Sequence, residues 1–142
     1  MKYIKKITPQ DFNKGLEDFY DVATKQEFWE VKGAYAFEHY LCWATLDDSC
    51  YFCFDYKTSN FIYFAIEKKL SNIKALFETF YEIVCAGYPF IGMVGRVGRY
   101  PRILKAFGHY SDPKQSLVEG KEEIIWYAGH PDNIEKIKRR FN

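Results

Sequence analysis

Apolar and polar residues recur with two different periods along the chain, and each change of period predicts a new element. Lys2 to Ile7 is short and β-prone, which indicates an edge strand. Thr8 is placed to cap a helix that has Pro9 at its first position and Asp11 near its positive end. Helical spacing continues in a second predicted helix from Lys25 to Glu38.

The middle of the chain has the shorter period of a β-sheet. Tyr40 to Leu46, Cys50 to Tyr56 and Phe61 to Ile66 are apolar, β-prone stretches that turn-forming residues separate. Three short strands joined by tight turns predict an antiparallel meander.

Helical spacing returns after the meander. Ser71 is placed to cap a helix that Gly87 and Pro89 end, and Phe90 to Val94 follows as a continuous apolar strand. A strand, a helix and a strand in this order predict a right-handed parallel crossover. Residues 61–66 and 90–94 should therefore be neighbouring parallel strands.

The last third of the chain adds a short helix from Pro101 and a hairpin. Gln115 to Glu119 and Glu123 to Ala128 flank the hairpin turn, and a last helix runs from about Asp132 to Phe141. The predicted fold is one α/β (α+β) domain over residues 1–142. Its sheet is mixed and mostly antiparallel, in the order β-α-α-β-β-β-α-β-α-β-β plus a C-terminal helix.

Composition narrows the class of protein. Hydrophobic residues make up 48% of the chain, enough for a real core, and the net charge of +1 gives nucleic-acid binding no support. No apolar run approaches the roughly 20 residues of a membrane span, and no signal-peptide pattern follows Met1 to Ile7. We therefore expect a cytoplasmic protein with no membrane partner, whose four cysteines are buried thiols rather than disulfides.

Cysteine and histidine spacing raises the question of a metal site. His39, Cys42, Cys50 and Cys53 offer four nitrogen and sulfur ligands, which suit tetrahedral zinc. However, Cys50 and Cys53 fall on one predicted strand, where an odd spacing puts them on opposite faces. No metal is therefore expected.

A glycine- and arginine-rich segment follows the predicted strand at 90–94. Ligands of α/β sheets often bind beyond the carboxyl ends of parallel strands, where Arg96 and Arg99 could bind a phosphate or a carboxylate. A turn with solvated arginines is the alternative interpretation.

Three stretches carry a resemblance to a known family, namely Phe90–Gly95, Arg102–Gly108 and Glu123–Tyr127. With the element order, they resemble the acyl-CoA N-acyltransferase (GNAT) fold, most closely its divergent bacteriophage-encoded members. The resemblance implies that the fourth and fifth strands splay apart around the thioester arm of acetyl-CoA or another acyl-CoA. It also implies that the N-terminus of the next helix binds the cofactor's pyrophosphate.

The same resemblance implies the site residues. Backbone N–H groups near Phe64, Ala65 and Ile66 would polarise the thioester carbonyl, and the cofactor's phosphates would meet Lys68, Lys69, Ser71, Asn72, Arg96 and Arg99. Glu30 and His39 are the candidate general bases for the amine. The loop from Glu67 to Asn72 lacks the family's glycines, and Leu104 stands where many members have a tyrosine.

Three functional hypotheses stay open. The first is a divergent GNAT-like acyltransferase, phage-encoded, that moves an acyl group from coenzyme A to a small-molecule or protein amine. The second is an inactive scaffold that acts as a phage structural protein or host inhibitor, with a second copy or a host or virion protein as its partner. The third is a nucleic-acid base-modifying enzyme. The location would be the host cytoplasm or the virion.

Overall fold

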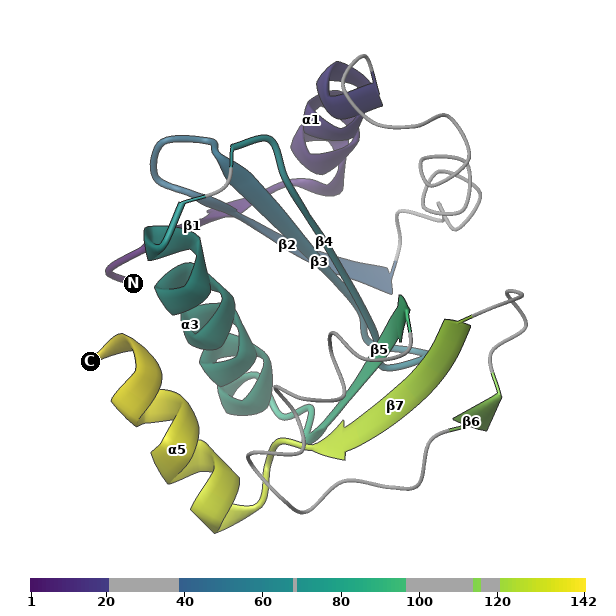
Figure 1. Ribbon diagram of the computed structural model, residues 1–142, viewed down its shortest axis with the longest axis vertical. Helices are drawn as coiled ribbons and strands as arrows, with labels where there is room; N and C mark the ends of the chain where they lie inside the picture. The colour runs from purple at the N-terminus through teal and green to yellow at the C-terminus, as the bar shows by residue number, and fades with distance from the viewer. Residues whose placement is uncertain (21–38, 68, 97–113, 116–120) are drawn as a thin grey trace.

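A mixed sheet runs through the computed structural model, which describes residues 1–20, 39–67, 69–96, 114–115 and 121–142. The strands lie in the order β1-β2-β3-β4-β5-β7-β6, and among these described strands only the β4–β5 pair is parallel (Figure 1). The elements are β1 (Ile4–Ile7), α1 (Pro9–Tyr20), β2 (Tyr40–Thr45), β3 (Cys50–Asp55), β4 (Asn60–Ala65), α3 (Ser71–Cys85), β5 (Phe90–Arg96), β6 (Lys114–Gln115), β7 (Lys121–Tyr127) and α5 (Pro131–Phe141).

The predicted fold class is confirmed, and so are the edge strand, the meander and the parallel pair. β2, β3 and β4 form the antiparallel meander, and β4 pairs in parallel with β5 through Asn60–Gly92 and Phe61–Met93. β6 and β7 pair antiparallel as the predicted hairpin does. The helices predicted over 25–38 and from Pro101 lie outside the described residues.

Local chemistry explains where α1 begins. The N–H of Asp11 donates to Oγ1 of Thr8 at 3.1 Å, and the N–H of Thr8 donates back to Oδ2 of Asp11 at 3.4 Å. This reciprocal pair satisfies two backbone N–H groups that have no partner within the helix. Pro9 needs no hydrogen-bond partner there because proline has no backbone N–H group. The predicted cap at Thr8 is therefore confirmed.

The ends of α3 differ in how well the sequence predicts them. Its stop is the predicted one: Gly87 takes φ +100°, and the N–H groups of Gly87 and Tyr88 donate to the carbonyls of Val84 and Ile83. The prediction that Ser71 caps the helix is wrong, because Ser71 is already its first residue. Leu70 takes the cap position with helical angles of −61° and −33°, and no side chain caps this end.

Helices cover both faces of the sheet. The alternation of strand residues sends Trp43, Phe52, Phe54 and Phe61 into one core with α3 and α5. It sends Cys42, Cys53 and Phe64 into a smaller core with Phe12 of α1. Ile137 and Phe141 of α5 are both buried in the first of these cores.

A buried carboxylate fastens the start of the chain to α3. Glu78 is 3% exposed, and its Oε1 accepts the N–H groups of Lys2, Tyr3 and Ile4 at 3.0, 2.9 and 3.1 Å. Three N–H bonds to one carboxylate compensate for the loss of water around its charge. Glu78 therefore holds the edge strand β1 against the helix.

No helix in the described part of the chain is long and apolar enough to cross a membrane.

Candidate functional site

β4 and β5 separate towards their carboxyl ends. Their ladder consists of Asn60–Gly92 and Phe61–Met93, and within the described residues it goes no further along either strand. The last four residues of β4 and the last three of β5 are therefore not paired with each other, and the two arrows diverge in Figure 1. The separation opens beside the point where the chain leaves β4 for α3.

The backbone of Ala65 faces this separation. The N–H of Ile66 donates to the carbonyl of Ser49 at 2.8 Å, so residues 66 and 49 form a hydrogen-bonded pair of the β3–β4 ladder. Hydrogen-bonded and non-hydrogen-bonded pairs alternate in an antiparallel ladder, so Ala65 and Cys50 form a non-hydrogen-bonded pair. The N–H of Ala65 consequently points away from β3, towards β5.

The two neighbours of Ala65 point their backbone groups the other way. Phe64 pairs with Tyr51 in the ladder, and its buried ring stacks on the Tyr51 ring at 5.2 Å on the α1 side of the sheet. Ile66 donates its N–H to Ser49, while its side chain is 40% exposed. Of the three predicted carbonyl-binding residues, Ala65 alone therefore directs its N–H into the separation.

Lys69, in the loop between β4 and α3, has carboxylate partners. Its Nζ lies 2.7 Å from Oδ2 of Asp47 and 3.4 Å from Oε2 of Glu67. The Lys69 ammonium, helped by hydrogen bonds from Ser49 and Thr45, holds the pKa of the Asp47 carboxyl well below its usual value. Asp47 in turn raises the pKa of Lys69. The charge predicted to meet a phosphate is thus balanced by two carboxylates.

Asn72 is also engaged within the protein. Its Oδ1 accepts the Ser49 hydroxyl at 3.0 Å, and its Nδ2 donates to the carbonyl of Glu67 at 2.7 Å. Ser49 is buried and also bonds Oγ1 of Thr45 at 3.1 Å. Asn72 therefore ties the first turn of α3 to the β2–β3 turn.

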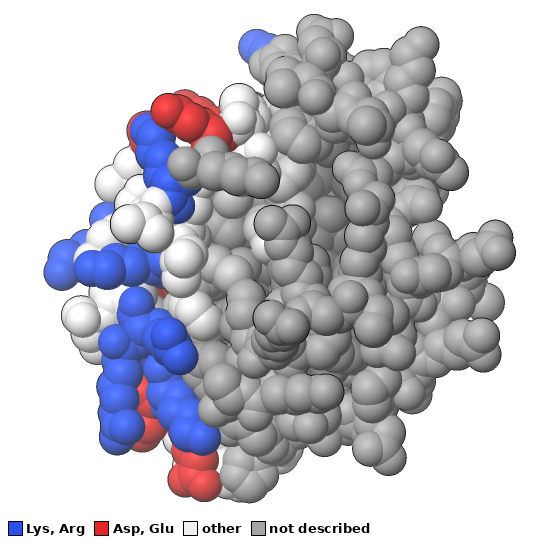
Figure 2. Space-filling view, viewed as in Figure 1, with Lys and Arg blue, Asp and Glu red and all other residues white. Residues whose placement is uncertain are grey.

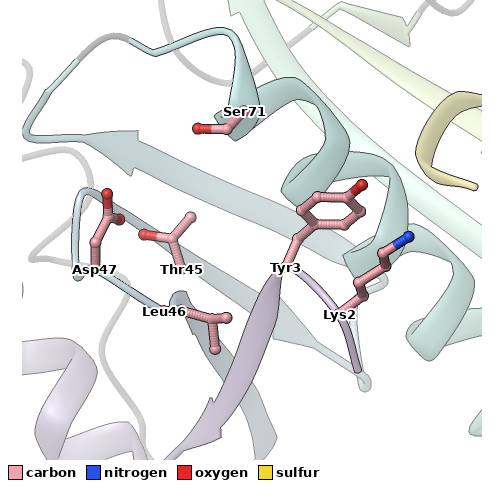
Figure 3. Close-up of a pocket in the computed structure, with 6 residues that line it drawn as sticks. All are labelled: Lys2, Tyr3, Thr45, Leu46, Asp47 and Ser71. Atoms are coloured by element: carbon pink, nitrogen blue, oxygen red, sulfur yellow. The ribbon is translucent and has the colours of Figure 1, made fainter.

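A hollow of about 220 Å³ lies at the start of α3, on the side away from the separation of β4 and β5. Figure 3 shows residues from the beginning of the chain, the β2–β3 turn and the first turn of α3 around it, namely Lys2, Tyr3, Thr45, Leu46, Asp47 and Ser71. It is near β1 and β2, whereas the separation opens beyond β4, roughly 10 Å further across the sheet. Of the predicted site residues that the structure describes, Ser71 alone lines this hollow.

His39 lies at the far end of the strands. Its carbonyl accepts the N–H of Tyr56, and its ring packs edge-on against the Tyr56 ring at 5.9 Å. Tyr56 is six residues along the chain from Cys50, the partner of Ala65, which is roughly 20 Å in a strand. The structure therefore does not bring His39 to the N–H of Ala65.

The remaining predicted residues are only partly placed. Arg96 is the last residue of β5 and pairs in register with Lys121. Glu30, Lys68 and Arg99 lie outside the described residues.

Cys42, Cys50 and Cys53 are buried as predicted, but Cys85 is exposed at the end of α3, so the prediction of a buried thiol is wrong for Cys85. Cys50 and Cys53 lie on opposite faces of the sheet, as their odd spacing predicted. Cys50 packs in the larger core, on the α3 side, and Cys53 in the smaller core, on the α1 side. Among the residues that the structure describes, no group of His, Cys, Asp and Glu could hold a metal ion.

Cationic side chains gather on the helical side of the molecule. Figure 2 shows Lys and Arg along the edge where α3 and α5 lie in Figure 1. The ammonium groups of Lys2 and Lys74 lie 5.7 and 5.6 Å from the centre of the Tyr3 ring, within reach of a cation–π attraction. Asp and Glu lie among these cations in the same view (Figure 2).

Sequence reasoning missed the β2–β3 turn as part of this region. Thr45, Asp47 and Ser49 are three short polar residues at alternate positions, a pattern that forms local hydrogen bonds at turns. The sequence around position 70 gives no sign that Lys69 and Asn72 would bond this turn, because the turn lies more than 20 residues earlier in the chain.

No family model matches the chain, and no curated protein matches its sequence significantly.

Proposed function

We propose that this protein is a GNAT-like acyltransferase that moves an acyl group from an acyl thioester, such as acyl-CoA, to an amine. The single observation that carries the proposal is the separation of β4 and β5, with the N–H of Ala65 directed into it. The resemblance to the GNAT fold implies that the thioester arm would lie between these two strands. The described order of strands and helices, with one parallel pair followed by an antiparallel hairpin, supports the same proposal.

The described residues fit the thioester arm better than the pyrophosphate. An extended arm can lie beside β4 and take the backbone groups that point away from β3. A pyrophosphate at the α3 start would meet Lys69 and Asn72, but both already have protein partners. We therefore assign no residue to the pyrophosphate.

The chemistry assigned to Ala65 is electrostatic. Attack of an amine on a thioester carbonyl places negative charge on the carbonyl oxygen, and a fixed N–H donor aimed at that oxygen lowers the barrier. The N–H of Ala65 is held in direction by the β3–β4 ladder on the other side of the strand, so it needs no rearrangement. Removing one such donor typically costs about 10²–10³ in rate.

Calorimetry with acetyl-CoA tests the proposal directly. We expect saturable heat of binding, and release of free thiol when an amine acceptor is added. No heat at millimolar acetyl-CoA would refute the proposed donor.

A proline at position 65 tests the assigned donor. Ala65→Pro removes the N–H that faces β5, while the hydrogen-bonded neighbours Phe64 and Ile66 keep their bonds to β3. We expect folded protein with a rate of acyl transfer about 10²-fold lower. Ala65→Val keeps the N–H and is the matched control; equal rates in both variants would contradict the role of this donor.

The rival hypothesis, a scaffold that binds another protein, is favoured by exposed apolar side chains at the start of α3. Leu70 is 86% exposed, Ile73 51% and Leu46 of the adjacent turn 60%. Apolar residues gathered on a surface often mark a contact with another protein. Light scattering tests for self-association: a stable oligomer that Leu70→Lys dissociates would favour the scaffold, and a monomer would count against a homo-oligomer.

A further inference from the structure

Two buried cysteines face each other across β2 and β3. Cys42 and Cys53 are direct partners in the ladder, and they are 0% and 2% exposed. The N–H of Tyr56 donates to the carbonyl of His39, which makes that pair a hydrogen-bonded one. The two kinds of pair alternate along an antiparallel ladder, and Cys42–Cys53 lies three positions from His39–Tyr56. Cys42–Cys53 is therefore a non-hydrogen-bonded pair.

This type of pair brings side chains closest together. Its Cα atoms lie about 4.5 Å apart, within the range of roughly 4.4–6.8 Å that a disulfide spans. The two thiols are also in contact: a hydrogen bond with Cys42, together with burial, raises the pKa of the Cys53 thiol. The strand pairing therefore gives the two cysteines a backbone separation of the kind that a disulfide spans.

The other two cysteines are placed differently. Cys50 packs on the opposite face of the sheet, where burial raises the pKa of its thiol to about 12. Cys85 is exposed, at the end of α3. Cys42 and Cys53 are therefore the pair in this chain that the fold sets up for an internal bond.

We propose that Cys42 and Cys53 form an oxidisable dithiol, a modification site that a small thiol oxidant converts to an intramolecular disulfide. With hydrogen peroxide, two S–H bonds and the O–O bond break, one S–S bond forms, and two molecules of water leave. Both sulfurs are oxidised, and the peroxide is the two-electron acceptor. The bond joins β2 to β3 underneath α1.

The cover over the pair sets the rate of this reaction. Phe12 of α1 and Phe64 of β4 pack in the same small core as the two cysteines. The oxidant reaches the thiols only when this cover opens, because thiols buried in apolar surroundings react slowly. The pair therefore reacts more slowly than the exposed Cys85 and needs no unfolding of the whole chain.

Thiol counting with mass mapping tests the proposal. Folded Cys85→Ser protein, which cannot link chains through its exposed thiol, is treated with hydrogen peroxide or diamide, then alkylated in denaturant. We expect the free thiols to fall by two, the mass before alkylation to fall by two hydrogen atoms, and one cross-linked peptide pair containing Cys42 and Cys53. Dithiothreitol should restore both thiols with no change in circular dichroism.

Matched variants separate this pair from general oxidation. In the Cys85→Ser background, Cys50→Ser should still lose two thiols, whereas Cys42→Ala and Cys53→Ala should form no internal bond. Each variant is used only where its thermal unfolding shows a folded protein. Unchanged thiols in the native protein, a bond mapped to Cys50, or a bond that forms only in denaturant would each overturn the proposal.

Discussion

Glu78 is the residue whose replacement best tests how the N-terminal strand is held. Its Oε1 accepts three N–H groups, from Lys2, Tyr3 and Ile4, and the side chain lies 3% exposed in α3. Glu78→Ala removes all of these acceptors at once. It leaves the fold of α3 itself unchanged, because alanine favours a helix at least as well as glutamate.

The expected loss follows from how far each N–H can reach water. Ile4 is 1% exposed, so its N–H is left without a partner at a cost of roughly 1–3 kcal/mol. Lys2 and Tyr3 are more exposed and can turn to water, which adds about 0.5 kcal/mol each. Removal of a buried charge offsets part of the sum, so we expect Glu78→Ala to lower the free energy of unfolding by about 1–3 kcal/mol.

Urea unfolding followed by circular dichroism measures this loss. Glu82→Ala is the matched control, since Glu82 lies one turn further along α3, and it should change stability by less than about 0.5 kcal/mol. Hydrogen exchange should show faster exchange at the amides of residues 2–4 in Glu78→Ala. Equal midpoints for the two variants, with unchanged exchange at these amides, would refute the reasoning.

Three further predictions concern the turn, α1 and the end of α3. The pKa of Asp47 is lowered in the folded protein, so its contribution to stability is present above the ordinary pKa of 3.8 and is lost as the pH falls below that value. In Asp47→Asn, the midpoint temperature of unfolding should therefore depend less on pH in that acid range. A Cβ on Gly15 would lie 2.7 Å from the Tyr51 ring, so Gly15→Ala should cost about 1–3 kcal/mol in urea unfolding, and adding Tyr51→Leu should recover part of it. Gly87→Ala meets no neighbour but takes φ +100°, so it should cost about 1–2 kcal/mol, and an unchanged midpoint would contradict this.

Elements whose causes are local could be predicted from the sequence. Thr8 and Asp11 cap α1 with each other, and Gly87 ends α3, because these contacts join residues within a few positions along the chain. The meander follows from alternating residues and turns, and its register needs no distant partner. The start of α3 was predicted wrongly at Ser71. The residue at the cap position, Leu70, has helical backbone angles and no capping side chain, so it carries none of the usual cap signals.

Contacts between distant segments could not be predicted in this way. Glu78 stands among buried residues of α3, so its charge was a signal of a buried partner, but the partner lies more than 70 positions earlier in the chain. His39 was a candidate base because of its side-chain chemistry, and only the strand pairing puts it at the far end from Ala65. Periodicity gives the face of an element but not its distant partner.

The backbone of the β4–α3 loop leads to a final prediction about the proposed donor. The N–H groups of Ile66 and Glu67 both donate to the carbonyl of Ser49, and those of Asn72 and Ile73 donate to Lys69 and Leu70. Glycines in such a loop would let N–H groups turn towards a phosphate, whereas here these four bond the protein. The pyrophosphate should therefore add little to binding.

Acetyl-CoA and an acetylated pantetheine that lacks the nucleotide separate the two parts of the donor. Because the arm lies beside β4 and the pyrophosphate gains little at the loop, we expect dissociation constants within about tenfold of each other, or about 1.4 kcal/mol. Lys69→Ala should leave both constants unchanged, since Asp47 and Glu67 already balance its charge. The opposite result is that the protein binds acetyl-CoA but not the acetylated pantetheine, and that Lys69→Ala weakens this binding. It would show that the loop holds the phosphates and would contradict the inference from its internal hydrogen bonds.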